Sequence, residues 1–202
     1  MADTYANYKE LAAVEVKGVD YDIHYHKVNG SKTIIFTPHG GGIEPGTSEL
    51  VKAVATSFYN WYEFDGMKPS GNSILHITST HFDEPIALKM VGESLYSMAL
   101  HGYNDTSMKH TNVGGLDYNL RDRVIKELKT EGFSAGVARD GLSGTEPKNI
   151  TNRTSRGKGV QLEISTLQRQ AFFINADTSR ANRINTTDVF KKYVKALQKA
   201  MG

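Results

Sequence analysis

The chain has 202 residues, a length that suits one α/β domain with a sizeable core. Its 24 Lys and Arg residues against 22 Asp and Glu residues create no strong overall field, so charge alone neither favours nor excludes a nucleic-acid partner. It contains no cysteine, which excludes disulfides, cysteine nucleophiles and thiolate metal sites. Any bound metal must therefore be held by histidine and carboxylate side chains.

Residues 1–11 contain no apolar stretch of the kind that a secretory signal requires, and no apolar run in the chain approaches the length of a membrane span. We therefore expect a single domain over residues 1–202 that is soluble, is made without an export signal and acts as a monomer. We expect neither a membrane partner nor a nucleic-acid partner.

Alternation of apolar and polar side chains, together with runs of β-branched and aromatic residues, predicts the strands. In the first of them Tyr21, Ile23 and Tyr25 alternate with polar residues, which is typical of a half-buried strand near a sheet edge. The strands are expected, in chain order, at residues 21–27, 33–37, 59–64, 73–79, 97–100, 133–138 and 159–165.

Apolar residues at helical spacing predict the helices between these strands. Thr47 or Ser48 is expected to cap the first helix, and Asp83 the second, with Pro85 near its first helical position. Gly132 is expected to end the third helix. The helices are expected at about residues 50–58, 85–93, 120–128 and 188–197. Strands that alternate with helices predict an α/β layered sheet.

One stretch of this pattern has the features of a site. A β-branched strand leads to His39, three glycines follow, and Glu44 stands just before a helix. Backbone with few side chains can approach a ligand closely and can adopt positive φ. Histidine and carboxylate are ligands that zinc takes in proteins. The same residues would also suit a glycine-rich turn whose histidine bonds the backbone, and the spacing alone leaves both interpretations open.

Four residues lie at or near predicted strand ends or in the loops beyond them, namely His39, Glu44, His101 and Glu163. We expect them to converge on one edge of the sheet, where ligands bind in open α/β folds. Two histidines and one glutamate suit a catalytic zinc that keeps a position for water. Glu163 would then take the proton of the attacking water and pass it to the leaving amine. As a strand residue, Glu163 would equally suit an ion pair with a lysine.

Other residues compete for these roles. His76 lies within a predicted strand and His81 just after it, and His81 is a candidate for contact with a ligand side chain or with substrate. Glu49 could replace Glu44, although it falls in a first helical turn, where the helix dipole makes acidic residues common. His24 and His26 share the polar face of the first strand, and we interpret them as a surface pair.

Six blocks of the sequence, in this order, resemble the phage-type poly-γ-glutamate hydrolase family: PHGGGIEPGTSE, LHITSTHFDEP, LHGY, VGGLDYNLRDRVIKEL, NITNR and GKGVQLEIS. The resemblance runs from DTYANYKEL to the final helix. It implies a fold similar to that of the zinc carboxypeptidases, with an open mixed parallel and antiparallel sheet flanked by helices. It also implies one zinc ion per chain, with His39, Glu44 and His101 matching its ligands and Glu163 matching the catalytic glutamate.

The chain departs from the carboxypeptidase pattern in two ways. His39 and Glu44 are further apart than the first two zinc ligands of those enzymes. In carboxypeptidases, moreover, the Asn-Arg pair that holds a C-terminal carboxylate precedes the last zinc histidine, whereas Asn152 and Arg153 follow His101 here. Exopeptidase specificity therefore does not transfer, and the family is associated with cleavage within the polymer.

The implied substrate is joined through γ-carboxyls and carries a free α-carboxylate on every unit, so its binding needs cations along a groove. The long polar stretch 139–156 exceeds the usual connection length and is typical of a functional loop. Arginine suits carboxylates because its fork is planar. Arg153 could alternatively stabilise the oxyanion of the reaction, and a solvated loop is the alternative for Arg156 and Lys158. The expected substrate-binding residues are Arg153, Arg156, Lys158, His81 and Asn152.

These observations predict a zinc-dependent amide hydrolase that cleaves within poly-γ-glutamate, in the setting of a phage enzyme that removes a host capsule. It would be made in the host cytoplasm and released at lysis. The first alternative is a small-molecule amidohydrolase that acts on an N-acylated glutamate with the same site. The second is a non-catalytic module that binds an anionic polymer or nucleic acid.

Overall fold

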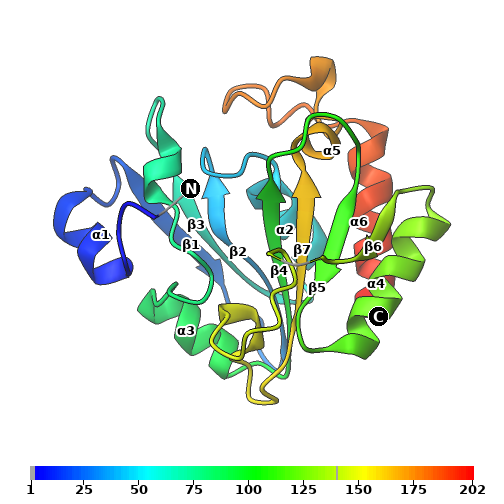
Figure 1. The fold of residues 1–202 in the computed structure, drawn as a ribbon, viewed down its shortest axis with the longest axis horizontal. Helices are drawn as coiled ribbons and strands as arrows, with labels where there is room; N and C mark the ends of the chain where they lie inside the picture. Colours follow the sequence, from blue (N-terminus) through cyan, green and yellow to red (C-terminus); the bar gives the residue numbers. More distant parts are fainter. Residues whose placement is uncertain (1–2, 140) are drawn as a thin grey trace.

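The computed structural model describes residues 3–139 and 141–202. Within these ranges the strands form one mixed sheet, which helices flank on both faces (Figure 1). The strands are β1 (Tyr21–His26), β2 (Thr33–Gly41), β3 (Asn60–Gly66), β4 (Tyr96–Tyr103), β5 (Thr111–Gly114), β6 (Ala135–Val137) and β7 (Val160–Ser165). The helices are α1 (Tyr8–Val14), α2 (Thr47–Ala55), α3 (Pro85–Gly92), α4 (Tyr118–Thr130), α5 (Thr166–Gln170) and α6 (Asp188–Met201). Short 3₁₀ turns are η1 (Asn72–Leu75), η2 (Ile150–Asn152) and η3 (Ile174–Ala176).

The sheet has the order β1-β3-β2-β4-β7-β5-β6. Its four central strands, β3, β2, β4 and β7, run parallel to one another, whereas β1 and β5 pair antiparallel with their central neighbours. The carboxyl ends of β2, β4 and β7 therefore meet at the same edge, which is where open α/β sheets bind ligands. Register places His101 of β4 directly beside Glu163 of β7.

The central strands are buried on both faces, which explains why they read as apolar runs in the sequence. Ile35, Leu100 and Leu162 belong to one core, with apolar residues of α2, α4 and α6. Ile34 and Phe36 belong to the core on the opposite face, with apolar residues of α1 and α3. The two cores hold the strand ends in fixed positions, and the site is built on those ends.

The predicted α/β fold with an open mixed sheet is confirmed. The strand expected over 21–27 is the edge strand β1, and Gly132 follows the end of α4 with φ of 89°. No helix in the described part of the chain is long and apolar enough to cross a membrane.

The capping predictions for α2 and α3 are wrong. The N-cap of α2 is Gly46, so that Thr47 and Ser48 lie inside the first turn and bond the preceding loop instead. Glu84 caps α3 by accepting from the Ala87 amide, and Asp83 accepts from the backbone amide of a residue in α1.

The strand predicted over 73–79 is also wrong, because this segment begins with η1 and continues as irregular backbone. Two of its apolar side chains, Leu75 and Ile77, are buried in the core with Phe82, so they give a strand-like pattern without strand pairing. β5 lies where no strand was predicted, and its Val113 pairs with Leu162 of β7. Helices α1 and α5 were not predicted.

Candidate metal centre

His39 lies near the end of β2, where the pairing with β3 shifts its register between Thr37 and Gly40. The glycines that follow allow the loop to stay against β3. A Cβ atom on Gly40 would lie 2.9 Å from the carbonyl oxygen of Phe64, and Gly41 has φ of 63°. Side chains at these positions would push the strand end away, so the glycines are required for the position of the histidine.

The loop after His39 turns back so that Glu44 faces the histidine. The Glu44 amide donates to the His39 carbonyl at 3.0 Å, and the Thr47 hydroxyl donates to the Glu44 carbonyl at 2.9 Å. The Ser48 hydroxyl accepts from the Gly41 amide at 2.8 Å. The first turn of α2 thus fixes the loop that presents the carboxylate.

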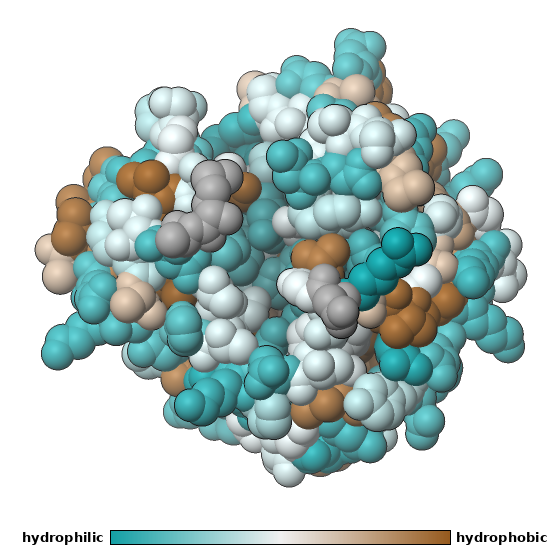
Figure 2. Space-filling view, in the orientation of Figure 1, coloured by the Kyte–Doolittle hydropathy of each residue, from teal (hydrophilic) through white to brown (hydrophobic). Residues whose placement is uncertain are grey.

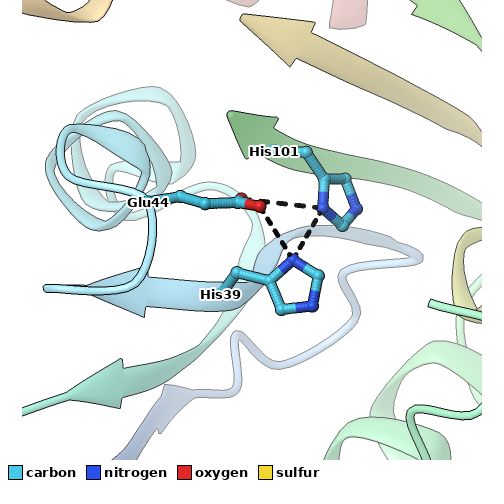
Figure 3. A group of neighbouring side chains, drawn as sticks. All are labelled: His39, Glu44 and His101. Carbon is cyan, nitrogen blue, oxygen red and sulfur yellow. Dashed lines mark hydrogen bonds and ion pairs between the residues drawn. The ribbon is translucent and has the colours of Figure 1, made fainter. Parts of the chain in front are cut away.

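The donor atoms of His39, Glu44 and His101 converge (Figure 3). His39 Nδ1 lies 3.2 Å from Glu44 Oε1 and 3.1 Å from His101 Nδ1. The distance between His101 Nδ1 and Glu44 Oε2 is 3.8 Å. A tetrahedral zinc ion with ligand distances near 2.1 Å separates its ligand atoms by about 3.4 Å. The donor set therefore fits a zinc ion in both chemistry and spacing.

Neighbouring groups orient each of the three donors. His39 Nε2 lies 2.8 Å from the Ile77 carbonyl and donates to it, so that in the neutral ring Nδ1 carries the lone pair. The Gly102 amide donates to Glu44 Oε2 at 2.8 Å. The ring of His76 stacks on that of His39, with ring centroids 4.0 Å apart. Such fixed orientation is what metal-binding side chains require.

The protonation of the site also suits a cation. Burial opposes the charge of Glu44, yet the facing His39, helped by His101 and the Gly102 amide, holds the pKa of the Glu44 carboxyl at about 2. Burial lowers the pKa of His101 to about 3, although the Glu44 charge acts in the other direction. At neutral pH the carboxylate is ionised and the His101 imidazole is neutral, as metal ligands must be. Burial opposes a charge on His39, but the facing Glu44 carboxylate raises the pKa of His39, so a bound metal ion would take the place of a proton on this ring.

Glu163 stands beside this centre on β7. Its Oε1 accepts from the Gln161 side-chain amide at 3.1 Å, and Gln161 in turn accepts from Asn149 at 2.8 Å. Burial raises the pKa of the Glu163 carboxyl well above its ordinary value, the Glu44 charge raises it further, and Arg169 lowers it. A carboxyl with a raised pKa can both accept and return a proton near neutral pH.

A cleft of about 630 Å³ opens over these residues. His39, His101 and Glu163 line it, and the rims are formed by residues 78–80 on one side and 141–144 on the other. The face in Figure 2 is hollowed near its centre, and the surface there is mainly hydrophilic. The long polar stretch predicted as a functional loop therefore borders the cleft; its residue 140 lies outside the described residues.

Asn152 was predicted to bind substrate, but its amide group is fully engaged in holding the polar loop. Its Oδ1 accepts from the amides of Leu116 and Gly159, and its Nδ2 donates to the carbonyls of Gly144 and Glu146. The side chain is 1 % exposed. Asn152 therefore holds the polar loop together, and its amide has no free hydrogen-bonding position for a substrate.

Arg153 supports a segment that forms the rim of the cleft, but it does not itself line the cleft. Its Nη2 donates to the carbonyl of Thr80, which is a lining residue, and its Nε donates to the carbonyl of Lys148. His81 is exposed just beyond this rim, and His76 lines the cleft in its place. The structure therefore brings neither Arg153 nor His81 into the cleft lining.

Arg156 and Lys158, which were expected along the substrate groove, do not line the cleft. Arg156 pairs with Asp117 at 3.0 Å and covers the ring of Tyr96, the first residue of β4. Lys158 precedes β7 by two residues. Arg156 lies near the amino end of β4 and Lys158 near the amino end of β7, whereas the site lies at the carboxyl ends of these strands. The five-residue step from Tyr96 to His101 along β4 spans about 16 Å. The prediction relied on the short distance in sequence between these residues and Glu163. Because β7 runs across the sheet, residues that precede it lie far from its carboxyl end.

A second group of potential ligands lies on β1 and β3, and it consists of His24, Glu63 and Asp65. Cationic side chains already face both carboxylates. Lys52 Nζ lies 2.7 Å from Glu63 Oε1, and Arg180 Nη2 lies 3.2 Å from Asp65 Oδ1. This group is therefore neutralised within the protein, unlike the centre at His39.

Several residues of the site were not predicted. Gln161 shares a strand face with Glu163, so the alternation of β7 could have indicated it. Asp3 and Arg169 carried no such signal. Asp3 accepts from the backbone amide of Thr78, 75 positions away, and Arg169 lies in a helix that was not predicted.

The chain is similar to known proteins over most of its length. The profile of the family described as poly-gamma-glutamate hydrolase matches residues 5–196. The chain is 44 % identical over 199 residues to the UPF0714 protein YmaC of Bacillus subtilis (strain 168), covering 97 % of this chain and 83 % of YmaC. It is 41 % identical over 200 residues to the SPbeta prophage-derived UPF0714 protein YoqZ of the same strain, covering 98 % of this chain and 71 % of YoqZ.

Two solved structures are similar over almost the full length. A bacteriophage poly-gamma-glutamate hydrolase superimposes with a TM-score of 0.96 at 47 % identity, covering 99 % of this chain and 97 % of its own. A zinc-free YndL superimposes with a TM-score of 0.91 at 35 % identity, covering 99 % of this chain and 98 % of the YndL chain. In sequence and in fold, this chain belongs to the poly-γ-glutamate hydrolase family.

Proposed function

We propose that this protein is a zinc-dependent hydrolase that cleaves γ-glutamyl amide bonds within poly-γ-glutamate. One observation carries the proposal, namely the convergence of His39, Glu44 and His101 at the base of a cleft that Glu163 also lines. Family membership supports the reaction. The related YndL structure is a zinc-free form, which supports zinc as the metal.

Zinc would be held by Nδ1 of His39, Nδ1 of His101 and the Glu44 carboxylate, where it would supply Lewis acidity toward water and the amide carbonyl. Glu163 accepts the proton of the attacking water at its carboxylate and returns it to the leaving α-amino nitrogen of the next glutamate unit. Gln161 holds Oε1 of Glu163, which leaves Oε2 as the oxygen that exchanges the proton.

The shape of the site supports action within a polymer. A second cavity of about 410 Å³ shares Glu44, His76 and Gly102 with the main cleft, so that substrate units can extend on both sides of the metal centre. The Asn152 amide is committed to the loop and offers no anchor for a chain end. A small N-acylated glutamate would leave much of this space unfilled.

The biological setting is part of the proposal. One similar structure is a bacteriophage enzyme, and one relative is prophage-derived. We infer that this protein degrades the poly-γ-glutamate capsule of a host, is made in the host cytoplasm and acts as a monomer outside the cell after lysis.

The test combines the zinc content of purified protein with the viscosity of a poly-γ-glutamate solution. We expect about one zinc per chain and a rapid loss of viscosity while few new amino ends form, which distinguishes internal from terminal cleavage. His101→Ala should lose both the metal and the activity. Glu163→Gln should keep the metal and lose activity by about 10²- to 10⁴-fold.

Arg121→Gln serves as a control, since Arg121 lies on α4 and pairs with the neighbouring Asp122. Wild-type protein that holds no zinc and leaves the polymer intact would refute the proposal. Salt-sensitive binding that persists in Glu163→Gln without any cleavage by the wild type would instead identify a binding module. Cleavage of N-acylglutamate but not of polymer would identify the small-molecule enzyme.

A further inference from the structure

Arg169 of α5 is a buried arginine without an ion pair. It is 7 % exposed, and no carboxylate oxygen among residues 3–139 and 141–202 lies within 4.0 Å of its guanidinium nitrogens. The other buried arginine of that part of the chain, Arg183, pairs with Glu49 at 3.2 Å. Because buried charges are normally paired, the arrangement at Arg169 is unusual.

The partners of Arg169 are all neutral. Its Nε donates to the Ile164 carbonyl at 3.1 Å, its Nη1 to the Pro45 carbonyl at 2.8 Å and its Nη2 to the Thr166 hydroxyl at 3.3 Å. A guanidinium has five N–H groups, so one remains on each terminal nitrogen. Two N–H groups on neighbouring nitrogens match the two oxygens of one carboxylate.

Arg169 also lines the second cavity, beside the metal centre. The cavity includes Glu44, His76 and Gly102, which it shares with the main cleft. The guanidinium lies directly over Gly102, since a Cβ atom there would come within 2.5 Å of its Cζ. Gly102 follows the ligand His101. A fixed cation therefore stands one residue from the metal centre, in a cavity that continues the substrate cleft.

We propose that the second cavity is the subsite of a glutamate unit flanking the cleaved bond, and that Arg169 binds the free α-carboxylate of that unit. This inference rests on the proposed function, and it assigns the specificity for a carboxylate-bearing backbone to one side chain. Once the Glu44 charge is engaged by a metal ion, the substrate carboxylate becomes the natural counter-charge of the guanidinium. The experiment below determines on which side of the cleaved bond this unit lies.

The test uses synthetic γ-linked glutamate oligomers in which one α-carboxylate is replaced by an α-carboxamide, on either side of a defined bond. For one of the two positions we expect wild-type kcat/KM to fall about 10- to 100-fold, as loss of a charged hydrogen-bonded pair predicts. Arg169→Gln should lower kcat/KM on the parent oligomer and bring the ratio of parent to carboxamide substrate close to one. Arg169→Lys keeps the charge without the fork and should give an intermediate ratio.

This ratio separates carboxylate recognition from a structural role, because a general loss of stability lowers both rates together. Arg121→Gln should keep the wild-type ratio. Binding of the same oligomers to Glu163→Gln protein, measured by calorimetry, should show the same preference without turnover. If Arg169→Gln does not fold, the wild type, Arg169→Lys and the calorimetry still decide.

The inference is overturned if wild-type protein cleaves the parent and both carboxamide oligomers equally well. It is also overturned if an arginine variant keeps the full discrimination. A wild type that cleaves none of the oligomers and no polymer refutes the proposed function itself, and the assignment of Arg169 falls with it. The two failures are therefore distinguishable by the wild-type rate on the parent substrate.

Discussion

Glu163 is subject to opposing electrostatic influences from its neighbours. Burial and the Glu44 charge raise its pKa, and Arg169 lowers it. In the proposed mechanism Glu163 must be ionised to accept a proton, so activity should fall as pH decreases through this pKa. A metal ion bound to Glu44 would weaken the effect of the Glu44 charge on the pKa of Glu163, but the effect of burial would remain. Its environment would thus set the acid limit of the proposed reaction.

We expect the acid limb of kcat/KM to lie above 4.5, the ordinary value for this carboxyl. In Arg169→Gln the lost positive charge no longer favours the ionised form, so the limb should move to higher pH. The measurement is kcat/KM from about pH 4 to about pH 9, with zinc content determined at each pH to separate proton uptake by the base from loss of metal. A limb below 4.5, or a shift to lower pH in the variant, would contradict this account.

Residues of the site differ in how far the sequence could predict them. His39, His101 and Glu163 follow or end apolar strands, so the sheet itself brings them together, and their convergence could be expected. Asp3 and Arg169 reach the site through irregular backbone or a short helix. Such paths leave no periodic pattern in the sequence, which explains why these residues were missed.

At the scale of elements, the connection between β2 and α2 is the part on which the metal centre depends. Hydroxyl groups of Thr47 and Ser48 bond the loop that carries Glu44. Their position in the sequence is typical of N-cap residues. Instead of capping the helix, they form hydrogen bonds with backbone groups of the loop that precedes it. Pattern alone does not distinguish these roles, because a glycine with positive φ can begin a helix without a side-chain cap.

Ser48→Ala should weaken this connection. It leaves the buried Gly41 amide without its partner, which should lower the free energy of unfolding by about 1–3 kcal/mol and weaken zinc binding, since Glu44 is held by the same loop. Denaturant unfolding and zinc titration measure the two effects. Ser57→Ala, at an exposed position after α2, should change neither. Unchanged stability and zinc affinity in Ser48→Ala would show that the hydroxyl is not needed to hold the loop.

At the scale of the whole molecule, two cores enclose a sheet whose centre is parallel. The fold class could be predicted because helices and strands alternate along the chain. The order of the strands could not be predicted, since β5 is only four residues long and ends in a glycine. Its pairing with β7 depends on contacts between distant segments, which no local pattern contains.

Leu197→Ala tests the independence of core and site. Leu197 lies on α6, fully buried among residues of α2 and α4, and its truncation should lower the free energy of unfolding by about 2–5 kcal/mol. Zinc content and kcat should stay at wild-type values well below the unfolding temperature, because α6 contributes no residue to the cleft. Lys192→Ala, at an exposed position on the same helix, is the matched control. Loss of zinc from folded Leu197→Ala would show that the core and the site are coupled.

The three parallel strands that carry His39, His101 and Glu163 are joined by crossovers, with 62 positions between the two histidines. Contacts of such sequence separation are slow to form, because the closure of a long loop must precede them. In a partly folded chain the candidate donor atoms would lie apart, because they meet only when β2 and β4 are paired. The proposed zinc ion would then be taken up after this pairing, as an indicator of folded chains rather than a nucleus for their formation.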